Sequence, residues 1–147
     1  MQLSRKADYA LRAIRYLSNL PKGKLGSINS IAHAEEIPRE FLAKILKDLT
    51  RSGILLSFQG VTGGYRMTKA PREVSFLDVI EAIEGPIHIN ICTEQGSNCV
   101  CDRVDTCNMH KFWITQEDNF KKALGKHHFG RYRGKPAKAR KTTRSKR

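Results

Sequence analysis

The sequence contains no apolar stretch long enough to cross a bilayer. The residues after Met1 are Gln-Leu-Ser-Arg-Lys rather than the apolar core of a secretory signal. We therefore expect a cytoplasmic protein without a membrane partner. Structural disulfides are rare in that reducing compartment, where clustered cysteines more often serve metal or redox chemistry.

Cysteine is missing from all of the chain except one short stretch, residues 92–107. Isolated core cysteines would be scattered through apolar segments, whereas these lie among Gly, Ser, Asn, Asp and Thr, a composition typical of loops. A loop of this kind binds a metal, forms disulfides or senses an oxidant. Its cysteines are Cys92, Cys99, Cys101 and Cys107.

Acidic residues are absent from residues 126–147, which contain ten Lys and Arg residues. The rest of the chain carries 17 basic and 14 acidic residues, so most of the formal charge of +13 belongs to this C-terminal segment. Because it has little apolar surface to bury, we predict a disordered basic tail. The tail either adds phosphate contacts that do not depend on sequence or serves only as a solubilising terminus.

The N-terminal part of the chain shows a succession of helical patterns. Apolar residues in 4–20 recur with the helical period, with Ser4 as a suitable N-cap and Pro21 at the end. Two shorter helices are predicted over 27–36 and 38–52, and the second has a basic outer face. Such a pair is typical of a helix-turn-helix, although many helix pairs merely pack together. We expect the inner face of the second helix to consist of Phe41, Leu42, Ile45 and Leu49.

A β-hairpin is predicted next, with strands over 54–58 and 65–68 around the Gly-rich segment 59–64. This segment lacks the Gly-Lys-Ser/Thr of a P-loop, so it does not indicate a nucleotide site. A helix-turn-helix followed by a hairpin is a winged helix. The predicted fold class is therefore mainly α with a small β wing.

Two further helices are predicted over 74–84 and 112–124, on either side of the cysteine loop. The second carries more apolar surface than a small winged helix could cover. We expect it to pack against the same helix of a second subunit, although a core helix within one chain would also explain the pattern. The residues that form this apolar surface are Phe112, Trp113, Phe120 and Leu124.

The predicted organisation therefore has five parts. It comprises a winged helix-turn-helix DNA-binding domain (1–70), a linking helix (71–90), a cysteine-rich loop (91–110), a long C-terminal dimerisation helix (111–125) and the basic tail (126–147).

Several segments occur together in a fixed order: 3–13, the helix pair 27–52, the wing sequence Gly-Val-Thr-Gly-Gly-Tyr at 60–65, 74–86 and the cysteine loop. In this combination the chain resembles the IscR/NsrR-type (Rrf family) winged helix-turn-helix transcriptional regulators. The resemblance implies a homodimer, expected to act as a repressor, that binds a partly palindromic operator in double-stranded DNA. It also implies an iron-sulfur cluster, 2Fe-2S or 4Fe-4S, that senses iron-sulfur status, nitric oxide or redox state.

The resemblance carries over to the cysteines one by one. Cys101 and Cys107 have the spacing of the last two family cysteines, and Cys92 matches the first by its position after Gly85 and Pro86. Cys99 is then a surplus thiol or an alternative to Cys101. For the fourth ligand the family offers His110 or Asp8 of the other subunit, with His33 as a weaker candidate. Each has an ordinary alternative, such as a pairing of Asp8 with Arg12.

A helix-turn-helix places the start of its second helix in the major groove. We expect base-edge contacts from Arg39, Glu40, Ala43 and Lys44. Phosphate contacts are expected from Lys47, Ser4, Lys6 and Ser27. The wing tip at Gln59 and Gly60 is expected to approach the minor groove, less strongly than the Arg that family members often carry at that place.

Two hypotheses without a cluster compete with the iron-sulfur hypothesis. Four cysteines, or three with His110, could close a tetrahedral zinc site, although the Cys-x-Cys spacing is unusual for zinc. Cys99 and Cys101 could instead form a disulfide on oxidation and act as a thiol switch. We find no base suitably spaced to activate a cysteine nucleophile, so an enzyme is not expected.

Overall fold

The computed structural model describes residues 2–94 and 101–132, so Cys99 and the tail from residue 133 lie outside the described residues. These described residues are mainly helical with one two-stranded antiparallel sheet, which confirms the predicted fold class. The main elements are α1 (Arg5–Ser18), α2 (Ile28–Glu35), α3 (Arg39–Arg51), β1 (Leu55–Phe58), β2 (Gly64–Met67), α4 (Phe76–Glu84) and α5 (Asn108–Gly125). Short 3₁₀ turns are η1 (Pro71–Glu73), η2 (Ile91–Thr93) and η3 (Phe129–Tyr132).

Serine side chains begin three of the helices. Ser4, Ser27 and Ser75 cap α1, α2 and α4, each accepting a hydrogen bond from a backbone N–H of the first turn. Asp78 completes a capping box with Ser75. This capping sets the start of α4 at Phe76 and leaves Val74, which the sequence placed in the helix, buried in extended chain.

The turn between α2 and α3 makes the helix-turn-helix compact. Glu36 ends α2 in the left-handed region, with a φ of 53°, and the N–H of Ile37 donates to the carbonyl of Ala32 at 3.0 Å. Ile37 is buried. The core beneath this turn consists of Ala10, Ala13, Ile14, Leu17, Ile31, Ile37, Leu42, Ile45, Leu46, Leu49, Leu55, Val74, Val79 and Phe129.

Phe41 corrects the predicted inner face of α3. Its side chain is 44% exposed and meets Tyr9 edge to face with ring centroids 5.9 Å apart, while Leu46 is fully buried instead. The helical period alone leaves the width and centre of the apolar face open, because both depend on which neighbouring helices cover it.

The wing is the β1–β2 hairpin, in which Leu55 pairs with Met67 and Phe58 with Gly64. Gly26, from the loop before α2, extends the ladder by exchanging two backbone hydrogen bonds of 2.9 Å with Tyr65. A Cβ at position 64 would lie 2.7 Å from the carbonyl oxygen of Gly26, so this close approach requires glycine. The hairpin is thereby anchored to the helical body.

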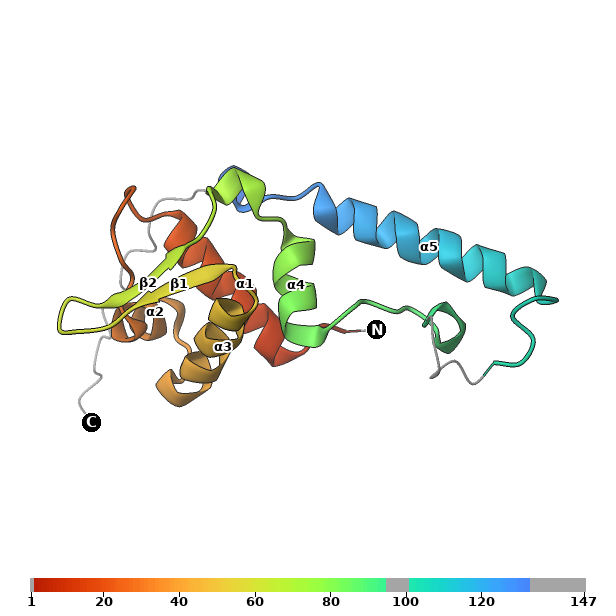
Figure 1. The fold of residues 1–147 in the computed structure, drawn as a ribbon, viewed down its shortest axis with the longest axis horizontal. Coiled ribbons are helices and arrows are strands. Elements are labelled where there is room, and N and C mark those ends of the chain that lie inside the picture. The colour runs from red at the N-terminus through yellow and green to blue at the C-terminus, as the bar shows by residue number, and fades with distance from the viewer. Residues whose placement is uncertain (1, 95–100, 133–147) are drawn as a thin grey trace, which may run out of the picture.

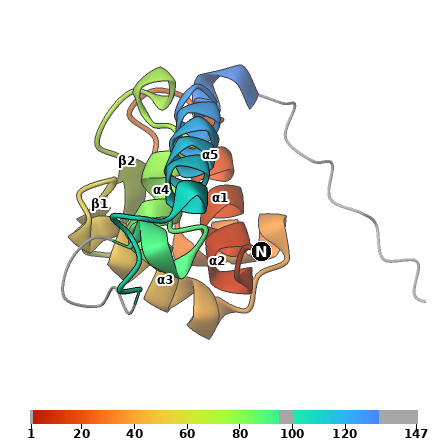
Figure 2. The same cartoon turned by 90° about the vertical axis from the view of Figure 1, so that its right-hand side faces the viewer.

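Figure 1 shows the winged helix at one end of the molecule and α5 extending away from it. The segment after α4 runs in the same direction as far as η2, and the chain returns along α5. In Figure 2, turned by 90°, α5 extends from the winged helix toward the viewer, and α5 contacts α4. The cysteine-containing segments therefore lie at the far end of α5 from the wing.

The segment after α5 returns to the winged helix and corrects the predicted start of the tail. Phe129 is 1% exposed, its N–H donates to the carbonyl of Val74 at 3.2 Å, and the N–H of Phe76 donates to the carbonyl of His127 at 2.9 Å. Residues 127–132 are thus ordered, because one aromatic side chain fills the core despite the basic composition around it.

The described ranges contain no helix long and apolar enough to span a membrane.

Candidate functional site

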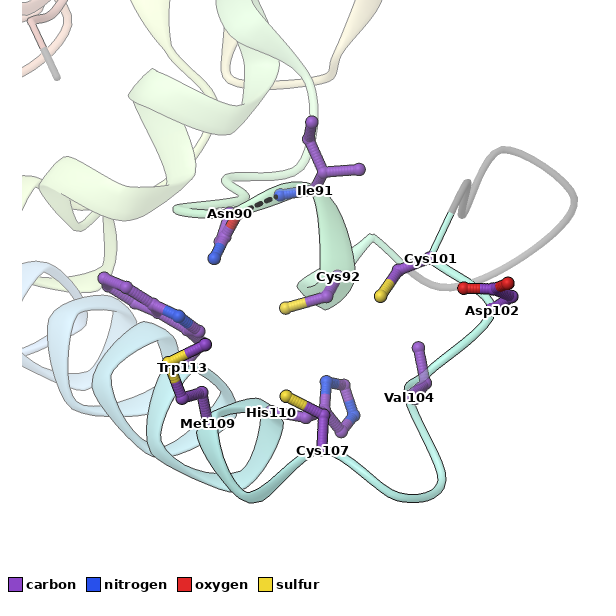
Figure 3. Close-up of a pocket in the computed structure, with 10 residues that line it drawn as sticks. All are labelled: Asn90, Ile91, Cys92, Cys101, Asp102, Val104, Cys107, Met109, His110 and Trp113. Atoms are coloured by element: carbon purple, nitrogen blue, oxygen red, sulfur yellow. Dashed lines mark hydrogen bonds between the residues drawn. The ribbon is translucent and has the colours of Figure 1, made fainter.

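Three cysteines of the described chain surround one pocket of about 380 Å³ (Figure 3). Cys92 comes from η2, Cys101 and Cys107 come from the segment before α5, and His110 projects from the first turn of α5. The remaining lining residues are Asn90, Ile91, Asp102, Val104, Met109 and Trp113. The sequence placed these four possible ligands in one loop, and the structure distributes them over three elements that face each other.

Local hydrogen bonds set the backbone on each side of this pocket. Asn90 begins η2, and its side chain accepts from the N–H of Ile91 at 2.8 Å, the dashed line in Figure 3. On the other side, the N–H of Cys107 donates to the carbonyl of Arg103 at 2.9 Å, and the N–H of His110 donates to the carbonyl of Cys107 at 3.1 Å. Cys107 is therefore held at the N-terminus of α5.

Helix α5 begins at Asn108, before the predicted boundary at 111. No side chain caps this end, so the sequence offers no capping signal there. His110 is consequently a helical residue and not part of a loop. The boundary between the predicted cysteine loop and the dimerisation helix moves accordingly.

His110 carries an unusual polar atom. Its Nδ1 is buried, and within the described residues it has no hydrogen-bond partner. A buried imidazole nitrogen is costly to leave unpaired, whereas a metal can use it as a ligand. Three thiols with one imidazole are a donor set compatible with an iron-sulfur cluster.

In the described ranges, no three His, Cys, Asp or Glu side chains stand close enough together to hold a single metal ion. A tetrahedral zinc ion needs its ligands within about 2.3 Å of one point. A cluster of several iron and sulfide ions is wider, so its ligands stand farther apart. The described residues thus line one pocket without presenting a closed set of ligands for a single ion.

The other two candidate ligands lie elsewhere in this chain. Asp8 is on the first turn of α1, and its carboxylate lies 3.7 Å from the guanidinium of Arg12. His33 is exposed on α2. Neither lines the cysteine pocket.

The predicted reading helix presents its polar side chains to solvent. Arg39, Glu40, Lys44 and Lys47 are exposed on α3, and Ala43 is half-buried. The Nε of Arg39 donates to the side-chain oxygen of Asn29 on α2 at 2.9 Å. This bond orients the guanidinium while leaving its two terminal nitrogens available, a role for Asn29 that the sequence reasoning missed.

The predicted phosphate-contacting residues have different environments. Lys6 forms an ion pair of 2.7 Å with Asp48 of α3. Ser4 donates to the carboxylate of Glu84 as well as capping α1. Ser27 caps α2 through the N–H of Ser30 at 3.1 Å.

A shallow basic surface joins the start of α1 to α3, and Asp48 lies within it. It is lined by Lys6, Phe41, Lys44, Ile45, Lys47, Asp48 and Arg51. Lys6 and Asp48 are remote in sequence, so their pairing could not be read from either helix alone. Asp48 neutralises part of a surface that would otherwise be strongly positive.

The wing tip carries Gln59 and Gly60, both exposed, followed by the fully exposed Val61. On the adjoining strands the guanidinium of Arg66 lies over the ring of Phe58, 4.9 Å from its centroid. Arg66 is thus a positive charge on the wing that the sequence reasoning did not single out.

Replacing Asp48 by Asn should strengthen DNA binding. The change keeps the shape of the side chain but frees Lys6 to contact a phosphate, so the slope of log K against log salt should become steeper by about one. Titrations of labelled duplex DNA at several salt concentrations measure this slope. Asp118→Asn, an exposed change on α5, is the control, and an unaltered slope in the Asp48 variant would contradict the assignment.

Protonation of Asp48 does not interfere with this measurement. The hydrogen bond from Lys6 and nearby positive charges outweigh burial and hold the pKa of Asp48 below its ordinary value. The pair therefore stabilises the fold at pH values above the ordinary pKa of an aspartate side chain. That contribution is lost only as the pH falls below about 4, through the lowered pKa of the folded state.

Comparisons of sequence and of structure find several known proteins that this chain resembles. A protein of Aquifex aeolicus (strain VF5), named as an HTH-type transcriptional regulator, is 31% identical over 113 residues, covering 77% of this chain and 78% of that protein. The structure of CymR (YrzC), the global cysteine regulator of B. subtilis, superposes with a TM-score of 0.72 at 22% identity, covering 90% of this chain and 96% of that one.

The structure of T. potens IscR superposes with a TM-score of 0.69 at 20% identity, covering 88% of this chain and 84% of that one. At these identities the two superpositions establish the fold. A family model, Rrf2, described as an iron-dependent transcriptional regulator, matches residues 3–131. That match covers the winged helix, the cysteine pocket and the returning segment together, and it confirms the resemblance seen in the sequence. This chain therefore belongs to the Rrf2 family of winged-helix, DNA-binding transcriptional regulators.

Proposed function

We propose that this regulator holds an iron-sulfur cluster in the cysteine pocket and that the state of the cluster controls its affinity for a partly palindromic operator. The observation that carries the proposal is the convergence of Cys92, Cys101, Cys107 and His110 on one pocket (Figure 3). The description of the family as iron-dependent favours iron over zinc.

The ligands have distinct roles in this proposal. The three thiolates bind iron, and the unpaired Nδ1 of His110 completes the set. A bound cluster supplies a redox-active, labile centre. Asp8 remains the alternative fourth ligand if it reaches the pocket of a second subunit, which would require release from Arg12.

A homodimer is the second part of the proposal. Helix α5 exposes apolar side chains along its length, which a second copy of the helix would cover. They are Met109 (67% exposed), Phe112 (54%), Ile114 (36%) and Phe120 (37%). Two winged helices related by two-fold symmetry would read the two halves of a palindromic operator.

The position of the pocket provides a route by which a change at the cluster reaches the winged helix. It lies where η2 meets the N-terminal end of α5, and the C-terminal end of α5 leads into the winged helix through Phe129. A change in the spacing of the thiols would shift α5 relative to α4 and so alter the separation of the two reading helices. Such control requires different DNA affinities in the two states.

The proposal is tested by anaerobic purification with an absorption spectrum and iron, sulfide and zinc analysis. Iron and acid-labile sulfide should be present in the native protein and lost in Cys92→Ala, Cys101→Ala and Cys107→Ala. Cys99→Ala is the matched control and should retain both. His110→Ala should bind a cluster that is lost faster to a chelator.

Operator binding by holo and apo protein completes the test. The two forms should differ in affinity at least tenfold, which corresponds to about 1.4 kcal/mol of coupling. Stoichiometric zinc in place of iron, or no metal with equal operator binding in both preparations, would exclude the cluster and leave the zinc or thiol-switch reading. Loss of iron in Cys99→Ala but not in Cys101→Ala would reassign the third ligand.

A further inference from the structure

Helix α5 carries one buried carboxylate, Glu117, which the proposed ligand set does not use. Glu117 is 7% exposed, although the other side chains of this part of α5 are polar or face solvent. Burying a carboxylate is costly unless it is fully hydrogen-bonded. Its partners therefore indicate what it does.

Most partners of Glu117 come from the segment that leads to Cys92. The N–H of Ile89 donates to Oε2 at 3.2 Å, and the Nδ1 of His88 lies 3.5 Å from Oε1. The side chain of Thr93, the residue after Cys92, lies close enough to the carboxylate to help lower its pKa. Lys121, one turn along α5, donates to Oε1 at 3.0 Å.

The same face of α5 lines the pocket. His110, Trp113 and Glu117 are spaced by three and four residues, so they lie above one another on the helix. His110 and Trp113 line the pocket directly. Glu117 is the next residue on that face. Its hydrogen bond from Ile89 holds the segment that leads to η2, on the other side of the pocket, against α5.

Thr93 links this contact to the turn that carries Cys92. Its side chain is 2% exposed, and its hydroxyl donates to the carbonyl of Asn90 at 2.8 Å, which closes η2. Asn90 is the N-cap of η2 and lines the pocket. The Thr93 hydroxyl thus closes η2 through Asn90, and its side chain lies beside Glu117.

Glu117 is ionised in this environment. Burial opposes ionisation, but the Thr93 side chain and hydrogen bonds from Lys121 and Ile89 outweigh it, so the pKa of Glu117 lies below its ordinary value. A carboxylate offers lone pairs on both oxygens and can therefore accept from α5 and from the facing segment at once.

We infer that Glu117 is a positioning residue for the cysteine pocket: it fixes the turn bearing Cys92 against the helix bearing Cys107 and His110. The inference rests on the proposed function for its consequence at the cluster, but the positioning itself is a property of the chain without metal. Glu117→Ala should release residues 88–93 while leaving the winged helix unchanged.

The first test uses metal-free, reduced protein. Amide exchange of Ile89 should be about tenfold faster or more in Glu117→Ala, because a hydrogen bond to a charged acceptor is lost. Alkylation of Cys92 by iodoacetamide, followed by mass spectrometry, should also accelerate several-fold, whereas that of Cys107 should not. Glu117→Gln keeps an acceptor oxygen, so its rates of exchange and alkylation should lie between those of the native protein and of Glu117→Ala. Asp118→Ala removes a neighbouring exposed ion pair with Lys122 and is the matched control.

The second test uses anaerobically loaded protein. Loss of the cluster to a chelator should be several-fold faster in Glu117→Ala, with native behaviour in Asp118→Ala. Amide exchange within α1 and α3 should be equal in all variants, which excludes general unfolding as the cause. Unchanged exchange at Ile89 and unchanged alkylation of Cys92 would overturn the inference.

Different results would contradict the proposed cluster and the proposed role of Glu117. If the native protein holds no iron, the proposed function fails and the first test alone decides whether Glu117 positions Cys92. If the native protein holds iron but the variants behave identically, the cluster stands and the role of Glu117 is withdrawn.

Discussion

Phe129→Ala is expected to lower the free energy of unfolding by about 3 to 5 kcal/mol, as for other fully buried aromatic side chains. Phe129 is 1% exposed, and its ring lies 4.8 Å from that of Phe76, measured between centroids. Truncation leaves a cavity between the returning segment and α4. Urea denaturation of the full chain at one protein concentration measures the loss.

Tyr132→Ala provides the control from the same 3₁₀ turn. Tyr132 also contacts Phe76, with centroids 5.0 Å apart, but it is 41% exposed. Its truncation removes less buried surface, so we expect a loss of about 1 kcal/mol or less. Equal effects of the two substitutions would mean that the segment after α5 is not part of the core.

Arg39→Ala is expected to change which operators bind, at a cost of about 1 to 3 kcal/mol on the preferred one. The side chain is exposed at the start of α3, and Asn29 holds its Nε at 2.9 Å. The two terminal nitrogens can then donate together to one base, most simply guanine. The measurement is a titration of the operator and of duplexes with single base-pair changes. Asn29→Ala should reproduce part of the loss.

Lys47→Ala is the matched comparison on the same helix. Its ammonium group is expected to contact a phosphate, so the substitution should weaken binding to all sequences alike and reduce the salt slope by about one. Both variants need titrations at several salt concentrations. If Arg39→Ala and Lys47→Ala lose the same affinity on every duplex, Arg39 does not read bases.

The elements of this fold could be read from the sequence because their signals are local. A serine at the start of α1, apolar residues at the helical period and a Gly-rich hairpin all act within a few residues. The same holds for the cysteines, whose clustering between 92 and 107 by itself indicates a metal or redox site. The start of α5 was misplaced because Cys107 does not cap it.

The order of the elements, the winged-helix fold, the family and the clustering of the thiols could all be predicted from the sequence. The arrangement of the thiols around one pocket, the place of His110 beside them and the burial of Phe129 appear only in the folded chain. The structure also shows Phe41 exposed, Lys6 paired with Asp48, and Glu117 holding the segment before Cys92. The physical reason is range: capping and periodicity act between near neighbours, whereas burial and pairing depend on segments brought together from distant parts of the chain.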